Sequence, residues 1–357
     1  MLAAGRALSS SARERAGTLW HPHGWMSFSV ARWLALSLLT VPAVPPLATH
    51  EVPLPGGPLV SMDYLGYDAL TQRVWIPAGN TGRVDVLDVE TGLLHALERF
   101  PTAEREGHGG RRVVGPSSVA LGGGLAWVGN RANDSICTVD AQTLARGACL
   151  KLPAAPDGLL HVEATHEVWA TVPALKELAI LDATSDDPAL KAILALDGKP
   201  EGYAVDEARG VYFTNLEDRD QTVGFDVRTR KQVSRWQTGC GLAGPRGMAF
   251  DVLDKVLLVA CTDGAVAFDA TTGEVRGRVI TGAGVDGIAY AASTRTLFVA
   301  SGTTAELQLF HVAPTGAMSL AAKAPTAAGA RVVVADGRGR AYVADSAQGR
   351  VIVVTPP

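Results

Sequence analysis

One position in a repeated phrase of this sequence carries charged side chains. It lies between Pro and Gly in PDGLLHV, PEGYAVD and PRGMAFD, where the residues are Asp157, Glu201 and Arg246. Aligning the phrase along the chain gives seven such positions, which we call the ring residues: Asp63, Ser117, Asp157, Glu201, Arg246, Asp286 and Arg331. Carboxylates can bind hard cations, and arginines can bind anions. The ring residues therefore form a candidate binding site if the fold brings the copies together.

A metal site is one interpretation of the ring residues. Asp63, Asp157 and Glu201 would converge on a divalent cation such as Ca²⁺, which needs several oxygen ligands. Three asparagines that follow later strands of the repeat would add carbonyl oxygens: Asn80, Asn130 and Asn215.

The alternation of charge predicts a structural belt instead. The sign changes at each step from Glu201 to Arg331, so charge-assisted hydrogen bonds can link the copies. Two arginines beside a cation are unfavourable, which favours the belt over the metal. In this belt Arg246 pairs with Glu201 or Asp286, and Asp157 is the acid left without an arginine. A third interpretation has Arg246 and Arg331 bind a small anionic ligand.

Other catalytic patterns are absent from the sequence. It contains no G-x-S-x-G, HExxH, P-loop or C-x-x-C-H. His161 and His166 lack a paired metal-ligand spacing and are interpreted as ordinary side chains. Whether the protein is an enzyme therefore stays open.

The elements that must position the ring residues are strands. Short apolar runs rich in Val, Ile and aromatic residues recur in two ordered series of seven, bounded by Gly, Asp, Asn and Pro. The first series reads RVWIPA, LAWVGN, EVWATV, GVYFTN, VLLVAC, TLFVAS and RAYVAD. Helical periodicity is nearly absent. A repeat of about 40–45 residues with four strands predicts an all-β, seven-bladed β-propeller of antiparallel blades. The ring residues then begin the innermost strands and line one mouth of the channel.

The ring closes through its first strand. The seventh copy ends at Pro357 after three strands, and residues 49–56 have no other place. We therefore predict that this segment is the outer strand of the last blade, because closure removes open sheet edges. One connection is also longer than the others. The surplus residues PTAEREGHGGRRVV, with His108, Arg111 and Arg112, are expected to form a partial lid over the charged mouth.

Two family resemblances follow from these motifs. The rhythm of DALTQRVWI and the turn VDVLDVETG resemble the YVTN/YncE-like seven-bladed propellers over residues 59–357. More distantly, PDG at Asp157 and PEG at Glu201, with Asp63 as the first-blade acid, resemble the gluconolactonase/senescence-marker propellers. That likeness implies a divalent metal that activates water or a lactone carbonyl. The sequence departs from it in its seven blades, in Arg246 and Arg331, and in lacking P-N-G.

Residues 1–48 are interpreted as an N-terminal extension and signal peptide. From about Met26, a positive residue (Arg32), an apolar run and small residues follow in the order of a secretory signal. The run is shorter than a comfortable membrane span, although an uncleaved anchor is the alternative. Residues 1–25 resemble an upstream extension, which leaves the start of translation open, and the propeller is assigned to residues 49–357. A periplasmic or secreted location follows.

The four cysteines suit an oxidising compartment. Cys137 and Cys149 flank a predicted hairpin turn, and Cys240 and Cys261 lie at one end of the fold, so two disulfides are expected. Four buried free thiols are the alternative.

Composition narrows the function. The 357 residues are 47% hydrophobic, with a net charge of −4 and no basic stripe, which argues against nucleic acid as a partner. We therefore predict an exported, monomeric scaffold that binds a small molecule or a protein through its channel mouth, without a certain cofactor. The alternative is a metal-dependent hydrolase of the lactonase type.

Overall fold

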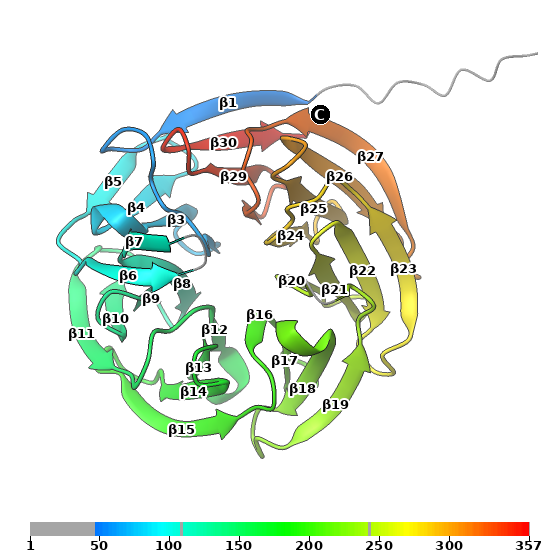
Figure 1. Cartoon of the computed structure of the whole chain (residues 1–357), viewed down its shortest axis with the longest axis horizontal. Helices are drawn as coiled ribbons and strands as arrows, with labels where there is room; N and C mark the ends of the chain where they lie inside the picture. Colours follow the sequence, from blue (N-terminus) through cyan, green and yellow to red (C-terminus); the bar gives the residue numbers. More distant parts are fainter. Residues whose placement is uncertain (1–46, 108–109, 242–243, 357) are drawn as a thin grey trace, which may run out of the picture. The chain divides into compact units, whose positions relative to one another are not determined.

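Seven four-stranded antiparallel sheets stand around a common axis (Figure 1). The computed structural model describes residues 47–107, 110–241 and 244–356. The predicted seven-bladed β-propeller is therefore confirmed. Within a blade we name the strands A to D from the innermost to the outermost.

The first four blades follow one another along the chain. Blade 1 contains β2 (Gly66–Asp68), β3 (Arg73–Ala78), β4 (Arg83–Asp88) and β5 (Leu94–Leu97). Blade 2 contains β8 (Pro116–Gly122), β9 (Leu125–Asn130), β10 (Ser135–Asp140) and β11 (Arg146–Lys151). Blade 3 contains β12 (Leu159–Val162), β13 (Glu167–Val172), β14 (Glu177–Asp182) and β15 (Ala189–Ala195). Blade 4 contains β16 (Pro200–Asp206), β17 (Val211–Leu216), β18 (Gln221–Asp226) and β19 (Gln232–Gln237).

The remaining blades complete the ring. Blade 5 contains β20 (Met248–Asp251), β21 (Val256–Cys261), β22 (Gly264–Asp269) and β23 (Val275–Ile280). Blade 6 contains β24 (Ile288–Ala291), β25 (Thr296–Ser301), β26 (Glu306–Val312) and β27 (Met318–Pro325). Blade 7 contains β28 (Val333–Ala335), β29 (Ala341–Asp345), β30 (Arg350–Thr355) and β1 (Ala48–Pro53). Three single-turn 3₁₀ helices interrupt the loops: η1 (Gly79–Thr81), η2 (Glu163–Thr165) and η3 (Glu217–Arg219).

The core lies between blades rather than within one. Strands B and C are buried almost throughout, whereas strand D alternates between exposed and partly buried positions. Each repeated strand-B phrase has a large residue, the fourth in GVYFTN and the third in the others, that is at most 2% exposed: Trp75, Trp127, Trp169, Phe213, Leu258, Phe298 and Tyr342. Each contributes to a cluster shared with the next blade. Continuous burial of apolar side chains on both faces is what makes these short segments strands.

The first described strand closes the ring, as predicted. β1 pairs antiparallel with β30 from Ala48 opposite Thr355 to Pro53 opposite Arg350. The predicted segment 49–56 thus provides the outer strand of blade 7. The predicted signal peptide lies outside the described residues, apart from its last two positions. None of the helices in the described ranges is long and apolar enough to cross a membrane.

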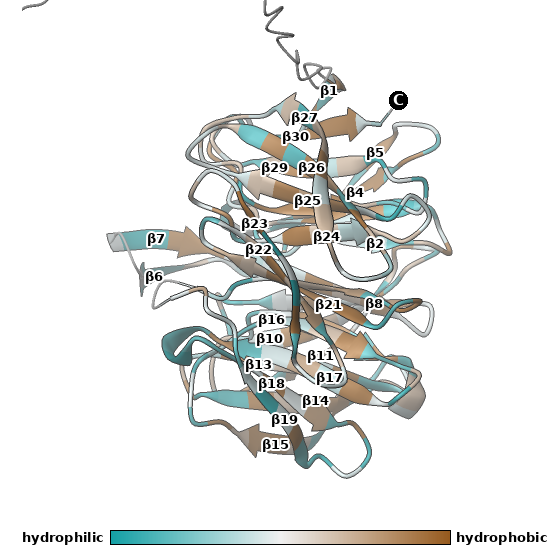
Figure 2. Ribbon diagram, turned by 90° about the vertical axis from the view of Figure 1, so that its right-hand side faces the viewer, coloured by the Kyte–Doolittle hydropathy of each residue, from teal (hydrophilic) through white to brown (hydrophobic). Residues whose placement is uncertain are grey.

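The long connection between blades 1 and 2 forms a hairpin. Its strands β6 (Ala103–Gly107) and β7 (Gly110–Val114) pair with each other and project from the ring along its axis (Figure 2). His108, which we expected in the lid, lies outside the described residues.

Both cysteine pairs form disulfides at the positions that the turns predict. Cys137 on β10 lies opposite Cys149 on β11, and their sulfurs are 2.04 Å apart. Cys240 and Cys261 are joined with an S–S distance of 2.00 Å.

Strand C ends in the same polar turn in several blades. In five of them an aspartate accepts a hydrogen bond from the backbone N–H of a threonine two or three residues later: Asp88, Asp140, Asp182, Asp226 and Asp269. These hydrogen bonds lower the pKa of each of the first four carboxyls below its ordinary value, because they favour the charged form. The turns lie on the face opposite the B–C loops, since successive strands run in opposite directions.

Candidate functional site at the channel mouth

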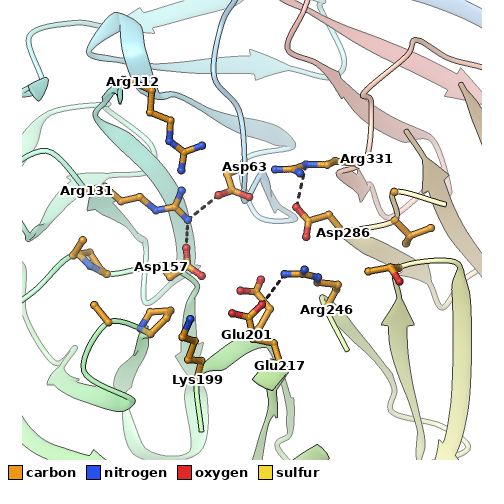
Figure 3. Close-up of a pocket in the computed structure, with 17 residues that line it drawn as sticks. Asp63, Arg112, Arg131, Asp157, Lys199, Glu201, Glu217, Arg246, Asp286 and Arg331 are labelled. Carbon is orange, nitrogen blue, oxygen red and sulfur yellow. Dashed lines mark hydrogen bonds and ion pairs between the residues drawn. The ribbon is translucent and has the colours of Figure 1, made fainter. Parts of the chain in front are cut away.

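One end of the channel opens into a cavity of about 760 Å³, which we call the mouth. Ten charged residues line it, five acidic and five basic: Asp63, Arg112, Arg131, Asp157, Lys199, Glu201, Glu217, Arg246, Asp286 and Arg331 (Figure 3). They come from the starts of strands A, from the B–C loops and from the β6–β7 hairpin. The mouth is therefore densely charged but balanced when every group is ionised.

Six of the seven ring residues line the mouth, and Ser117 does not. Ser117 is 7% exposed, and its hydroxyl has no hydrogen-bond partner among the described residues. The reason is a shifted bulge. In blade 4 the bulge falls on Gly202, whose φ of 68° suits glycine, and Glu201 stays paired with Asn215. Blade 2 has no glycine at that place, and the unpaired residue is Ser117 itself.

Arg131 holds two of the ring acids together. It follows β9 and places its guanidinium 2.7 Å from Asp63, with a second ion pair to Asp157 (Figure 3). The prediction that Asp157 lacks an arginine is therefore wrong. Burial lowers the pKa of Arg131, but its carboxylate neighbours, led by Asp63, raise that pKa by more.

The same arginine bears on the predicted metal site. Its guanidinium lies between Asp63 and Asp157, which are two of the three proposed ligands. No group of three or more His, Cys, Asp or Glu residues in the described part of the chain is arranged to hold a metal ion. The guanidinium of Arg131 thus supplies the positive charge between Asp63 and Asp157 that the metal interpretation assigned to a bound cation.

The three asparagines proposed as extra ligands serve the backbone instead. Asn80 accepts from the N–H of Ser61 at 2.8 Å and donates to the carbonyl of Leu59. Asn130 accepts from the N–H of Ala132, and Asn215 accepts from the hydroxyl of Thr222 at 2.6 Å. None of them lines the mouth. Their side chains therefore fix loops, which is a common use of asparagine.

Two further ion pairs belong to the mouth. Arg246 pairs with Glu217 of η3 at 2.8 Å, a partner that the sequence did not predict. Arg331 lies 3.2 Å from Asp286, as the alternating belt predicts. Burial raises the pKa of Asp286, although Arg331 opposes that shift. The predicted pair of Arg331 with Asp286 is therefore present, whereas Arg131 and Glu217, which lie outside the repeated phrase, pair with other ring residues.

Glu201 is the acid without a cationic partner. Its side chain makes no ion pair within the described ranges, and it accepts a hydrogen bond from the Tyr64 hydroxyl at 2.5 Å. Burial raises the pKa of Glu201 to about 7, and the nearby carboxylates of Asp286 and Asp63 act in the same direction. Tyr64 stacks on Tyr203 with ring centroids 5.6 Å apart. Both rings line a separate, smaller cavity of about 260 Å³.

Arg112 and Lys199 are the basic residues that remain uncommitted. Arg112 reaches the mouth from the hairpin and Lys199 from the connection before β16 (Figure 3). Neither side chain makes an ion pair or a hydrogen bond with the residues that the structure describes. The predicted lid therefore does supply one arginine to the charged mouth. Arg111 instead pairs with Glu104 within the hairpin.

The sequence pattern did not identify three residues that line the mouth, Arg131, Lys199 and Glu217, nor Tyr64, which donates a hydrogen bond to Glu201. Each is next to, or two positions from, a residue that had been singled out, namely Asp63, Asn130, Glu201 and Asn215. These residues could therefore have been found in the sequence by looking next to the ring positions and in the B–C loops.

The fold and the site together define the class of protein: a seven-bladed β-propeller with a charged channel mouth. A chain from the mitotic checkpoint complex superposes with a TM-score of 0.69 at 13% identity, covering 97% of this chain and 99% of that chain. The RRP9 WD40 repeats superpose with a TM-score of 0.70 at 12% identity, covering 87% and 99%. Hydrazine synthase from Kuenenia stuttgartiensis superposes with a TM-score of 0.68 at 13% identity, covering 84% of this chain and 96% of that chain.

At such identities the likeness shows the fold alone. No family model and no curated protein matches the chain. The resemblances to the YVTN/YncE-like and gluconolactonase families therefore stay predictions, and the fold is that of a propeller with WD40-like structural neighbours.

Proposed function

We propose that this protein is an exported β-propeller that binds, at its channel mouth, a small molecule or partner group carrying a negative charge. The observation that carries this proposal is the pair of uncommitted cations, Arg112 and Lys199, that line a cavity of about 760 Å³. Cavities of this size suit small ligands. A belt that served stability alone would leave no such cations facing the cavity.

The other mouth residues fit the same role. Arg131 and Arg246 are already paired with carboxylates, so they supply a fixed framework. Glu201 can accept hydrogen bonds from hydroxyl or amine groups of a ligand whose anionic group contacts Arg112 and Lys199. Charge-assisted hydrogen bonds of this kind are the strong ones.

The proposed location is the periplasm or the outside of the cell. The secretory pattern from Met26 and the two disulfides support it, since such bonds persist in oxidising compartments. We further propose that the protein is monomeric and YVTN/YncE-like. The alternative lactonase needs a cation near Asp63 and Asp157, where the guanidinium of Arg131 lies, and we do not favour it.

Thermal unfolding with inorganic phosphate tests this proposal. Phosphate should raise the melting midpoint of residues 49–357 more than sodium chloride of equal ionic strength does. The double variant Arg112→Ala, Lys199→Ala should weaken phosphate binding about tenfold or more, because each charged hydrogen bond contributes about 1.5–3 kcal/mol.

The matched control is Arg228→Ala, Lys231→Ala, which removes two exposed cations from a C–D turn on the opposite face. This control should bind phosphate as the unaltered protein does. An equal phosphate effect in both double variants would place the anion elsewhere. Stabilisation by CaCl₂ without any effect of phosphate would instead support the metal interpretation.

A further inference from the structure

A second cavity of about 410 Å³ lies between blades 7 and 1, and we call it the side groove. Its walls are mainly apolar: Leu59, Val60, Met62, Val332, Ala344 and Ala347. Two serines complete the lining, and the hydroxyl of one of them, Ser346, accepts from the N–H of Met62. No carboxylate belongs to the lining among the described residues. The side groove is thus chemically unlike the mouth.

Arg331 belongs to both cavities. Its Nε lies 3.2 Å from Asp286, and its side chain is 57% exposed. Its terminal nitrogens make no hydrogen bond within the described ranges. An arginine can bind a carboxylate through two parallel hydrogen bonds, so these free donors can take an anion at the junction of the two cavities.

Leu59 is an exposed apolar residue on the wall of the side groove. It is 72% exposed and has a φ of 64°, a region that leucine rarely adopts. Its backbone is held there by a bond from its N–H to Ala347 and by the Asn80 side chain, which donates to its carbonyl at 2.7 Å. Unusual backbone geometry that neighbouring groups maintain is typical of binding sites.

We propose that the side groove holds the apolar chain of a carboxylic acid whose carboxylate binds Arg331. This inference rests on the proposed recognition of anions at the mouth and adds a class of ligand, a straight-chain alkanoate of medium length. The single cation at the rim and the apolar walls match the two ends of such a molecule. A ligand with charges along its length would instead leave polar groups against Val60, Met62 and Val332, which is unfavourable.

The test is a calorimetric titration of residues 49–357 with acetate, butanoate, hexanoate and octanoate, below micelle-forming concentrations. A fully buried methylene strengthens binding about fourfold, so affinity should rise about two- to fourfold for each added carbon. Arg331→Ala should abolish octanoate binding. Ala347→Tyr should fill the groove and remove the dependence on chain length, whereas Ala347→Ser is the conservative control. Melting curves identify any variant that has not folded.

The outcomes separate the two proposals. Phosphate reports on Arg112 and Lys199, and the alkanoates report on the side groove. Octanoate binding without phosphate binding would overturn the proposed function and leave the groove standing. Equal affinity across the alkanoate series would overturn the groove. Binding of an acetylated dipeptide ending in leucine, without octanoate binding, would also overturn the alkanoate assignment.

Discussion

The free energy of unfolding should fall as pH rises because Glu201 ionises, and replacing Glu201 by glutamine should prevent this fall. The carboxyl is partly buried, accepts a hydrogen bond from Tyr64 and has a pKa of about 7, above the ordinary value of 4.5. The folded chain therefore binds this proton more tightly than the unfolded chain does. Its stabilising contribution is complete below about pH 4.5 and is lost as pH rises through about 7.

The magnitude follows from the two pKa values. One pKa unit corresponds to about 1.4 kcal/mol, so a pKa of about 7 against 4.5 gives at most about 3.5 kcal/mol at pH 8. The carboxyl borders a solvent-filled mouth, so we expect about 1–2 kcal/mol. Glu201→Gln keeps the acceptor for the Tyr64 hydroxyl and stays neutral. The variant should match the unaltered protein near pH 4.5 and exceed its free energy of unfolding at pH 8.

Urea unfolding followed by tryptophan fluorescence between pH 4.5 and 8 measures this difference. Glu274→Gln is the control, because Glu274 is exposed and its side chain makes no hydrogen bond or ion pair with the described residues. That control should show the pH dependence of the unaltered protein. If the stability gap between Glu201→Gln and the unaltered protein stays constant across this range, Glu201 is ionised throughout and our account of its pKa fails.

Two other predictions concern the scaffold. The aspartates of the C–D turns have lowered pKa values, so their contribution to the stability of the fold is present above the ordinary pKa of 3.8 and is lost as pH falls further. Asp88→Ala should therefore lower the melting midpoint at pH 7 and have little effect near pH 2. An equal effect at both pH values would contradict this. Deleting residues 47–53 should expose the edge of β30, reduce stability and cause association that grows with concentration; light scattering that shows an equally stable monomer would refute the role of β1.

The propeller was predictable because each blade repeats the same burial. Trp75, Trp127 and Trp169 occupy one position of successive strands, and such positions show in the sequence as recurring apolar runs. Closure was predictable because the last copy lacks one strand and the chain has a spare one at its start. Strand pairing then leaves few alternatives, since slipping by one residue would turn the apolar set outward.

The site was less predictable than the fold. Register places the start of each strand A at the mouth, and six of the seven ring residues line it. Ser117 differs because it is itself the unpaired residue of the bulge in blade 2, whereas in blade 4 the unpaired residue is Gly202. The partners of the acids come from loops, where side-chain direction is set by local turns rather than by the repeat. Arg131 and Glu217 therefore changed the predicted pairing.

The pairing of β1 with β30 also orders events during folding. Ala48 lies opposite Thr355, so the last blade joins two segments separated by nearly the whole described chain. Such a distant contact forms slowly, because a very long loop must close before it is made. The strand that emerges first from the ribosome must therefore wait for the one that emerges last.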